Sequence, residues 1–102
     1  MLVVLTTVPN VAEGEELAGR IVSAKLAACV QVLPQMTSVY FWEDVIQKET
    51  EHLLLIKTLE EKFDELSEFI RANHSYSVPE IVAVRAERVS EDYLHWIADY
   101  LN

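Results

Sequence analysis

AACVQVLPQMTSVYFW (27–42) and VIQKETEHLLLIKT (45–58) are two extended segments separated by Glu43 and Asp44. Both are rich in β-branched and aromatic residues, so they predict two strands joined by a tight turn. At about 3.3 Å per residue, residues 29–42 would reach roughly 46 Å when fully extended. A chain of 102 residues forms a domain with a radius of gyration near 13 Å and a diameter of only about 33 Å. The hairpin is therefore expected to project beyond its own core.

The projecting half of this hairpin is apolar. It carries VYFW (39–42), and a two-stranded ribbon with an uncovered apolar face is not stable alone in water. Another copy of the chain is the simplest cover, so we expect self-association through Tyr40 and Trp42. Pro34 has no N–H to donate to a sheet, which predicts a bulge or kink between the core half and the projecting half of the strand.

The returning segment changes character along its length. Gln47–His52 is polar and Leu53–Ile56 is apolar, which is the pattern of an exposed tip that leads into a buried base. Leu2–Leu5 is also apolar at successive positions, so both faces of the central strands are expected to be buried. Self-association would cover the sheet face that the helices leave open.

Turn and capping signals predict the elements around the hairpin. Leu2–Thr7 is a continuous apolar and β-branched run, which favours a central strand. Asn10 then predicts the N-cap of a helix, with Glu13 as its capping-box partner. Gly19, inside this helix, is expected to allow close packing on the sheet.

Similar signals predict the second half of the chain. Thr58 is expected to cap a second helix with Glu61 as its partner, Ile81–Ala86 predicts a strand, and Ser90 is expected to cap a last helix. The order strand, helix, strand, strand, helix, strand is the split βαβ arrangement. We therefore predict an α+β, ferredoxin-like fold with an antiparallel sheet, a long hairpin between its second and third strands, and a C-terminal helix.

Composition fits a single domain that spans residues 1–102. The chain is 51% apolar and 25% charged, which suffices for an ordinary core. Its formal net charge of -9 repels phosphate backbones and anionic membrane surfaces, so we expect no nucleic-acid or membrane partner. The apolar run Met1–Val8 is shorter than the 18 or so residues that a membrane span needs. The single cysteine, Cys29, agrees with a reducing compartment, and we expect a cytoplasmic location.

Four strings carry a resemblance to a known family: KLAACVQVLPQMTSVYFW (25–42), EHLLLIKT (51–58), HSYSVPEIVAV (74–84) and YLHW (93–96). With their spacings they resemble the CutA family of divalent-cation tolerance proteins, and the match covers nearly the whole chain. The resemblance implies a ferredoxin-like homotrimer whose long hairpins wrap neighbouring subunits, a cytosolic location in bacteria, and a link to copper and other divalent metals.

His74 and Cys29 are the candidate metal ligands. Copper prefers thiolate and imidazole, but Thr6 stands where some family members carry a cysteine, and Asn73 stands where some carry the first of two histidines. We therefore expect weak binding of copper or another divalent cation. The alternatives are that Cys29 packs as a small hydrophobe and that His74 caps a helix. The other two histidines are expected to be ordinary surface residues; they are His52, near the hairpin tip, and His95, on the last helix.

Lys57, Tyr76 and Glu80 are the candidate small-ligand residues. Each lies at the edge of an apolar element, where a buried polar group needs a partner. A pair between Lys57 and Glu80 could line a pocket between subunits, and the alternative is a structural ion pair.

These features lead to two functional hypotheses. The first is a homotrimeric, non-catalytic protein of divalent-cation tolerance that binds metal weakly, and the second is a regulatory trimer that senses a small molecule in clefts between subunits. We expect no enzymatic activity, because the sequence has no phosphate-binding Gly-rich loop, no GxSxG, no HExxH and no CxxC.

Overall fold

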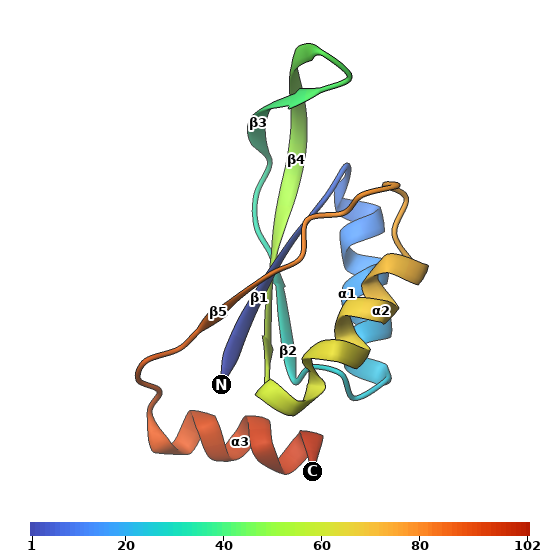
Figure 1. Cartoon of the computed structure of the whole chain (residues 1–102). Helices are drawn as coiled ribbons and strands as arrows, with labels where there is room; N and C mark the ends of the chain where they lie inside the picture. Colours follow the sequence, from blue (N-terminus) through green and yellow to red (C-terminus); the bar gives the residue numbers. More distant parts are fainter.

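The computed structural model describes residues 1–102 and combines an antiparallel sheet with three α-helices (Figure 1). The α+β prediction is therefore confirmed. Along the chain the elements are β1 (Leu2–Val8), α1 (Val11–Ser23), β2 (Cys29–Val32), β3 (Met36–Trp42), β4 (Val45–Thr58), a 3-10 turn (Glu60–Lys62), α2 (Phe63–Ala72), β5 (Val82–Arg85) and α3 (Glu91–Leu101).

The long strand β4 organises the sheet. Its second half pairs with β1 and β2, with Val8 opposite His52 and Val32 opposite Leu54. Its first half pairs only with β3, from Trp42 opposite Val45 to Met36 opposite Glu51. The strand order is β2-β4-β1-β5, with β3 attached to β4 outside that path. The sheet is thus four strands wide at the base and only two at the hairpin.

The hairpin projects from the domain as predicted (Figure 1). The molecule extends 44 Å along its longest axis but only 25 and 22 Å across. Residues Leu33, Pro34 and Gln35 separate β2 from β3, so the predicted break at Pro34 is confirmed. At the turn, Glu43 and Asp44 both have positive φ, 51° and 63°, the pair of left-handed conformations that a two-residue hairpin turn requires.

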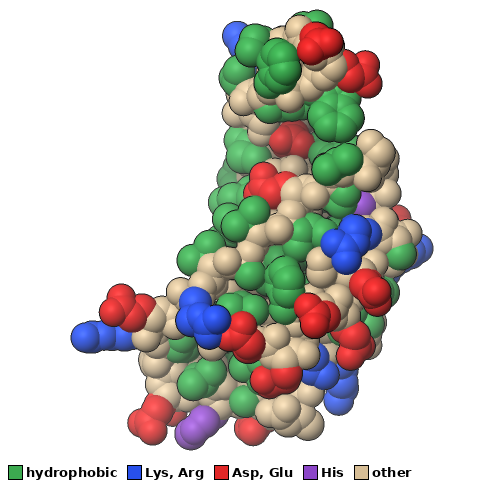
Figure 2. Space-filling model, viewed as in Figure 1, with side chains coloured by type: hydrophobic (Ala, Val, Ile, Leu, Met, Phe, Trp, Pro, Cys, Tyr) green, Lys and Arg blue, Asp and Glu red, His purple; other side chains and the backbone are tan.

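Large apolar side chains are exposed near the hairpin tip. Val39 is 62%, Phe41 65% and Ile46 68% exposed, and Figure 2 shows hydrophobic side chains over this end of the molecule. The prediction that Gln47–His52 forms the exposed tip is wrong in part. Glu51 is only 7% exposed, because it lies where the hairpin meets the rest of the domain. The true tip is the acidic turn of Glu43 and Asp44, flanked by exposed apolar side chains.

The core lies between the sheet and helices α1 and α2, which cover one of its faces (Figure 1). Val4, Leu54 and Ile56 of the central strands belong to the same buried cluster as Ile21 of α1 and Leu66 of α2. A smaller cluster holds α3 against the base of the sheet; its members are Ala28, Ile97 and Leu101.

The opposite sheet face has no such cover. Along β1 and β4, Val3, Leu5, Leu53 and Leu55 alternate with the core residues and are only half-buried. Burial of the central strands on both faces is therefore not achieved within one chain. Alternation sends successive side chains to opposite faces, and the helices cover only one of them.

The first helix begins as predicted, but its close approach to the sheet lies elsewhere. The side-chain oxygen of Asn10 accepts a 2.8 Å hydrogen bond from the Glu13 amide, which confirms the N-cap. The close approach is at Gly14, not at Gly19. A Cβ on Gly14 would lie 3.0 Å from the Val8 side chain, whereas one on Gly19 would meet nothing within 4 Å.

Two further predictions are wrong in detail. Thr58 does not cap the second helix, because it ends β4 and its buried hydroxyl donates to the Leu26 carbonyl at 2.7 Å. The chain then passes through the 3-10 turn, and neither that turn nor α2 has a side-chain cap. His52 is not a surface residue of the tip, because it is half-buried and its Nδ1 lies 2.9 Å from the Leu33 carbonyl oxygen. No helix combines the length and the apolar character that crossing a membrane demands.

Candidate functional site

A cleft of about 650 Å³ lies between the base of the hairpin and the segment that connects α2 to β5. We call it the hairpin cleft. Its volume is within the range of roughly 300 to 1,000 Å³ that is typical of small-molecule sites. It is lined by Thr7, Ser38, Val39, Tyr40, Trp42, Glu51, Ser75, Tyr76, Ser77, Val78 and Glu80.

A buried carboxylate and a phenol form the polar centre of this cleft. The Tyr76 hydroxyl donates a 2.6 Å hydrogen bond to Oε2 of Glu51. Glu51 is 7% exposed, and buried carboxylates are normally paired with a cation or several donors. Neither ion pair of the chain involves Glu51, since they join Glu16 to Arg20 and Glu60 to Arg85. Tyr76 is its only side-chain hydrogen-bond donor, and the other oxygen, Oε1, is not fully enclosed by the protein.

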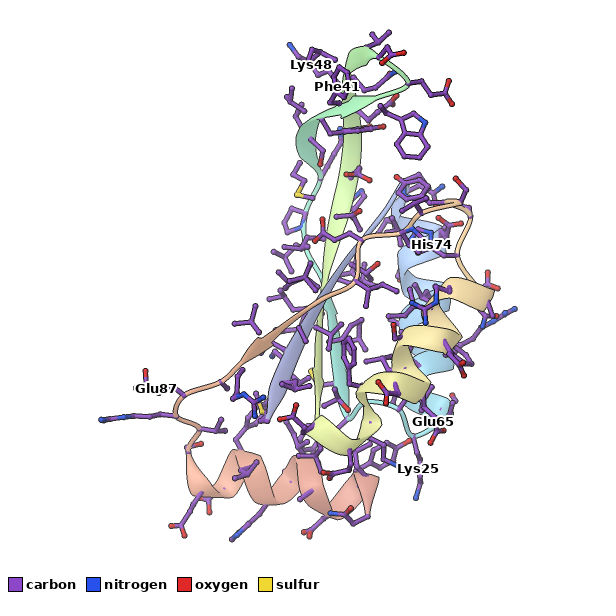
Figure 3. All side chains as sticks on the ribbon, in the orientation of Figure 1. Lys25, Phe41, Lys48, Glu65, His74 and Glu87 are labelled. Carbon is purple, nitrogen blue, oxygen red and sulfur yellow. The ribbon has the colours of Figure 1, made fainter.

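His74 holds Tyr76 in place. Its Nε2 lies 2.7 Å from the Thr7 carbonyl oxygen, and its Nδ1 accepts a 3.0 Å hydrogen bond from the Tyr76 amide. A carbonyl can only accept, so the imidazole is neutral with its proton on Nε2. The two rings also pack, with centroids 4.8 Å apart. His74 thus ties the end of β1 to the segment that carries Tyr76, just beyond α2 (Figure 3).

The charges around the hairpin cleft are all negative. Glu51 and Glu80 line it, and no lysine, arginine or histidine does. Burial, and then the hydrogen bond and charge of Glu51, raise the pKa of the Tyr76 phenol well above its usual range. Partial desolvation and the charges of Glu49 and Glu51 also raise the pKa of Tyr40. Both phenols stay protonated at neutral pH, so the cleft offers hydroxyls and carboxylates and favours a ligand that carries positive charge.

The structure brings together two of the three predicted small-ligand residues. Tyr76 and Glu80 both line the hairpin cleft. Lys57 lies at the other end of β4, where its Nζ donates to Gln31 at 2.8 Å and lies 3.5 Å from the Tyr93 hydroxyl. The predicted pair of Lys57 with Glu80 is therefore not formed within one chain.

The two predicted metal ligands lie on different parts of the molecule. Cys29 begins β2, is half-buried and sits opposite Lys57 in the strand register, beside a cation rather than beside other metal ligands. His74 uses both ring nitrogens in hydrogen bonds to the protein, which leaves no free lone pair for a metal. Nowhere does one chain gather three or more His, Cys, Asp or Glu side chains that could hold a metal ion.

Comparison with known proteins decides the family. The sequence pattern described as CutA1 divalent ion tolerance protein matches residues 2–100. The chain belongs to this family. The CutA resemblance in the sequence is thus confirmed, and it extends from β1 to α3.

Relatives within the CutA family share both sequence and fold with this chain. "Protein CutA 1, chloroplastic" of Oryza sativa is 48% identical over 96 residues, which cover 94% of this chain and 54% of the rice protein. This chain thus spans about half the length of that relative. "Divalent-cation tolerance protein CutA" of Thermus thermophilus is 40% identical over 97 residues, covering 95% of this chain and 94% of that protein. The crystal structure of CutA1 from Oryza sativa superposes with a TM-score of 0.96 at 46% identity, covering 99% of this chain and 93% of that chain.

Sequence reasoning missed Glu51, the most buried charged residue of the CutA fold described here. It lies in the polar run 47–52, and the pattern of that run predicts an exposed, solvated tip. One signal marks it: only His52 separates it from the apolar run 53–56, at the point where β4 passes from two-stranded pairing to the full sheet. Tyr40 and Trp42, predicted only as contacts between subunits, also line the cleft.

Proposed function

We propose that the protein serves divalent-cation tolerance by binding rather than by catalysis, and that it holds a small ligand in the hairpin cleft as a sensor or regulator. The observation that carries this proposal is the largely buried Glu51, which accepts a hydrogen bond from Tyr76 and lines a cleft that has no basic side chain. Buried charges are normally paired, so a ligand that supplies the missing counterion is favoured there. The family description supports the link to divalent ions.

The assembly that we propose is a ferredoxin-like homotrimer in the cytoplasm. The exposed apolar side chains of the hairpin and the half-buried outer face of the sheet support self-association. Contiguous apolar surface of this kind marks sites of protein contact. The single cysteine supports a reducing compartment. Tyr40 and Trp42 would then serve both the subunit contact and the cleft wall.

Binding in the hairpin cleft is tested by thermal shift against a panel of small metabolites. A ligand that binds only the folded protein must raise its melting temperature. We expect at least one compound to raise the melting temperature of the natural protein but not that of Ser38→Phe. Ser38 is half-buried and lines the cleft, so a phenyl ring at this position would fill it. Thr37→Phe is the matched control, because Thr37 is the exposed neighbour that does not line the cleft. A shift that survives Ser38→Phe would place the ligand elsewhere.

The second candidate is direct, weak binding of copper or another divalent cation by Cys29 and His74. The family description favours it, but such a site would need His74 to break its hydrogen bonds, or ligands from more than one subunit. Under this candidate, Cu²⁺ releases heat in titration calorimetry with the natural protein, and Cys29→Ala abolishes that heat while His95→Ala retains it. Equal heats from all three proteins would remove Cys29 from the site.

A further inference from the structure

We propose that the hairpin cleft takes a small organic cation with a protonated amine, whose ammonium group pairs with the free oxygen of Glu51. This inference rests on the proposed function, since it names the class of ligand for the same cleft. The class of ligand follows from the chemistry of one largely buried side chain.

Glu51 has no counterion within the chain. The residue is 7% exposed, and its one side-chain hydrogen-bond donor is the neutral Tyr76 hydroxyl. A carboxylate has room for several donors, and the other oxygen is not fully enclosed by the protein, so a ligand can reach it. A cation in the cleft would complete this group, and the chain provides no basic side chain there.

The cleft suits an ammonium group better than a bare metal ion. Tyr76 occupies Oε2 of Glu51, so only Oε1 is left without a donor from the protein. Divalent metal ions in proteins need several oxygen or nitrogen ligands at fixed positions, and no group of three such acidic, histidine or cysteine side chains exists here. An ammonium group needs acceptors for three N–H donors. The cleft offers Glu51, Glu80 and the hydroxyl of Ser38.

The cleft also has an aromatic wall that can cover the carbon part of the ligand. Trp42 and Tyr40 line the same cleft as Glu51. Aromatic faces attract cations and cover apolar groups. The cleft therefore joins one anionic anchor to an aromatic wall, which suits an amine that carries an apolar or aromatic group.

Benzylamine, protonated at neutral pH, is a suitable probe, with benzyl alcohol and benzoate as its uncharged and anionic counterparts. We expect benzylamine to bind to the natural protein at least tenfold more tightly than either counterpart in ligand-observed NMR titrations. Glu51→Gln should weaken benzylamine at least tenfold and leave benzyl alcohol unchanged. Glu49→Gln is the matched control, because it removes the same charge from an exposed position on the same strand, outside the cleft.

Tyr76→Phe provides a second, independent variant. It frees the other oxygen of Glu51, so benzylamine should bind at least as tightly as to the natural protein. Glu51→Gln keeps the size of the side chain and an acceptor for Tyr76, and its melting temperature checks that it folds.

Two results would overturn the inference. Equal affinity of benzylamine and benzyl alcohol, with no effect of Glu51→Gln, would show that the cleft binds ligands but does not select amines; the proposed function would then stand alone. Absence of benzylamine binding, together with a metabolite shift that Ser38→Phe abolishes, would also reject the amine class while supporting the cleft. No metabolite shift at all would reject the proposed function itself.

Discussion

Trp42→Glu is expected to convert the proposed trimer into monomers. Trp42 is 44% exposed at the end of β3, a strand that pairs only with β4. Burying the exposed part of such a side chain between subunits contributes on the order of 2 kcal/mol at each contact. A glutamate in its place would instead have to lose its hydration without a cation nearby. Since a closed trimer repeats the contact three times, one substitution acts at every interface.

Multi-angle light scattering at several protein concentrations measures this effect. Thr50→Glu is the matched control, because it adds the same charge to an exposed polar position on the partner strand of the hairpin. The control should keep the mass of the natural protein. If Trp42→Glu also kept that mass, the hairpin would not be the contact, and its exposed apolar side chains would need another partner.

His74→Ala is expected to lower the free energy of unfolding by about 2–4 kcal/mol. The substitution removes two hydrogen bonds, and the loss of each one leaves a poorly solvated backbone group unpaired. The groups are the Thr7 carbonyl, in a residue that is 7% exposed, and the Tyr76 amide. Urea denaturation at a fixed protein concentration measures the loss. It should be accompanied by weaker ligand binding in the hairpin cleft, because the segment with Ser75, Tyr76 and Ser77, one wall of the cleft, would be less firmly tied to the end of β1.

His95→Ala is the control for this prediction. His95 is exposed on α3, and surface substitutions of this kind usually change stability by less than about 0.5 kcal/mol. A His74→Ala protein as stable as the natural one would contradict the structural role of the imidazole. If it also lost heat of copper binding, the histidine would instead be a metal ligand.

Local patterns in the sequence predicted most of the fold. The break at Pro34, the turn at Glu43 and Asp44, and the cap at Asn10 each depend on the residues next to them in the chain. A missing N–H, a left-handed turn or a short capping side chain acts over a few residues, so the sequence reveals it directly. The cap expected at Thr58 does not form, because the Thr58 hydroxyl donates its hydrogen bond to the carbonyl of Leu26, which is distant in the sequence.

The hairpin cleft could not be predicted in the same way. The sequence correctly indicates Tyr76 and Glu80 as neighbours in one site. It wrongly suggests Lys57 as their partner, because Lys57 lies at the far end of β4. The mistake has a simple origin. A polar residue beside an apolar run is recognisable as a group that needs a partner, but the partner is set by strand register and by the path of a distant loop.

The order of the elements, the projection of the hairpin and the family to which the chain belongs all follow from the sequence alone. The burial of Glu51, its hydrogen bond from Tyr76, and the contacts by which His74 holds Tyr76 at the end of β1 appear only in the folded molecule. The residues involved are far apart along the chain. These side chains come from segments that are brought together only when β4 pairs with β1 and the segment after α2 returns to the sheet, and no short-range pattern encodes that meeting.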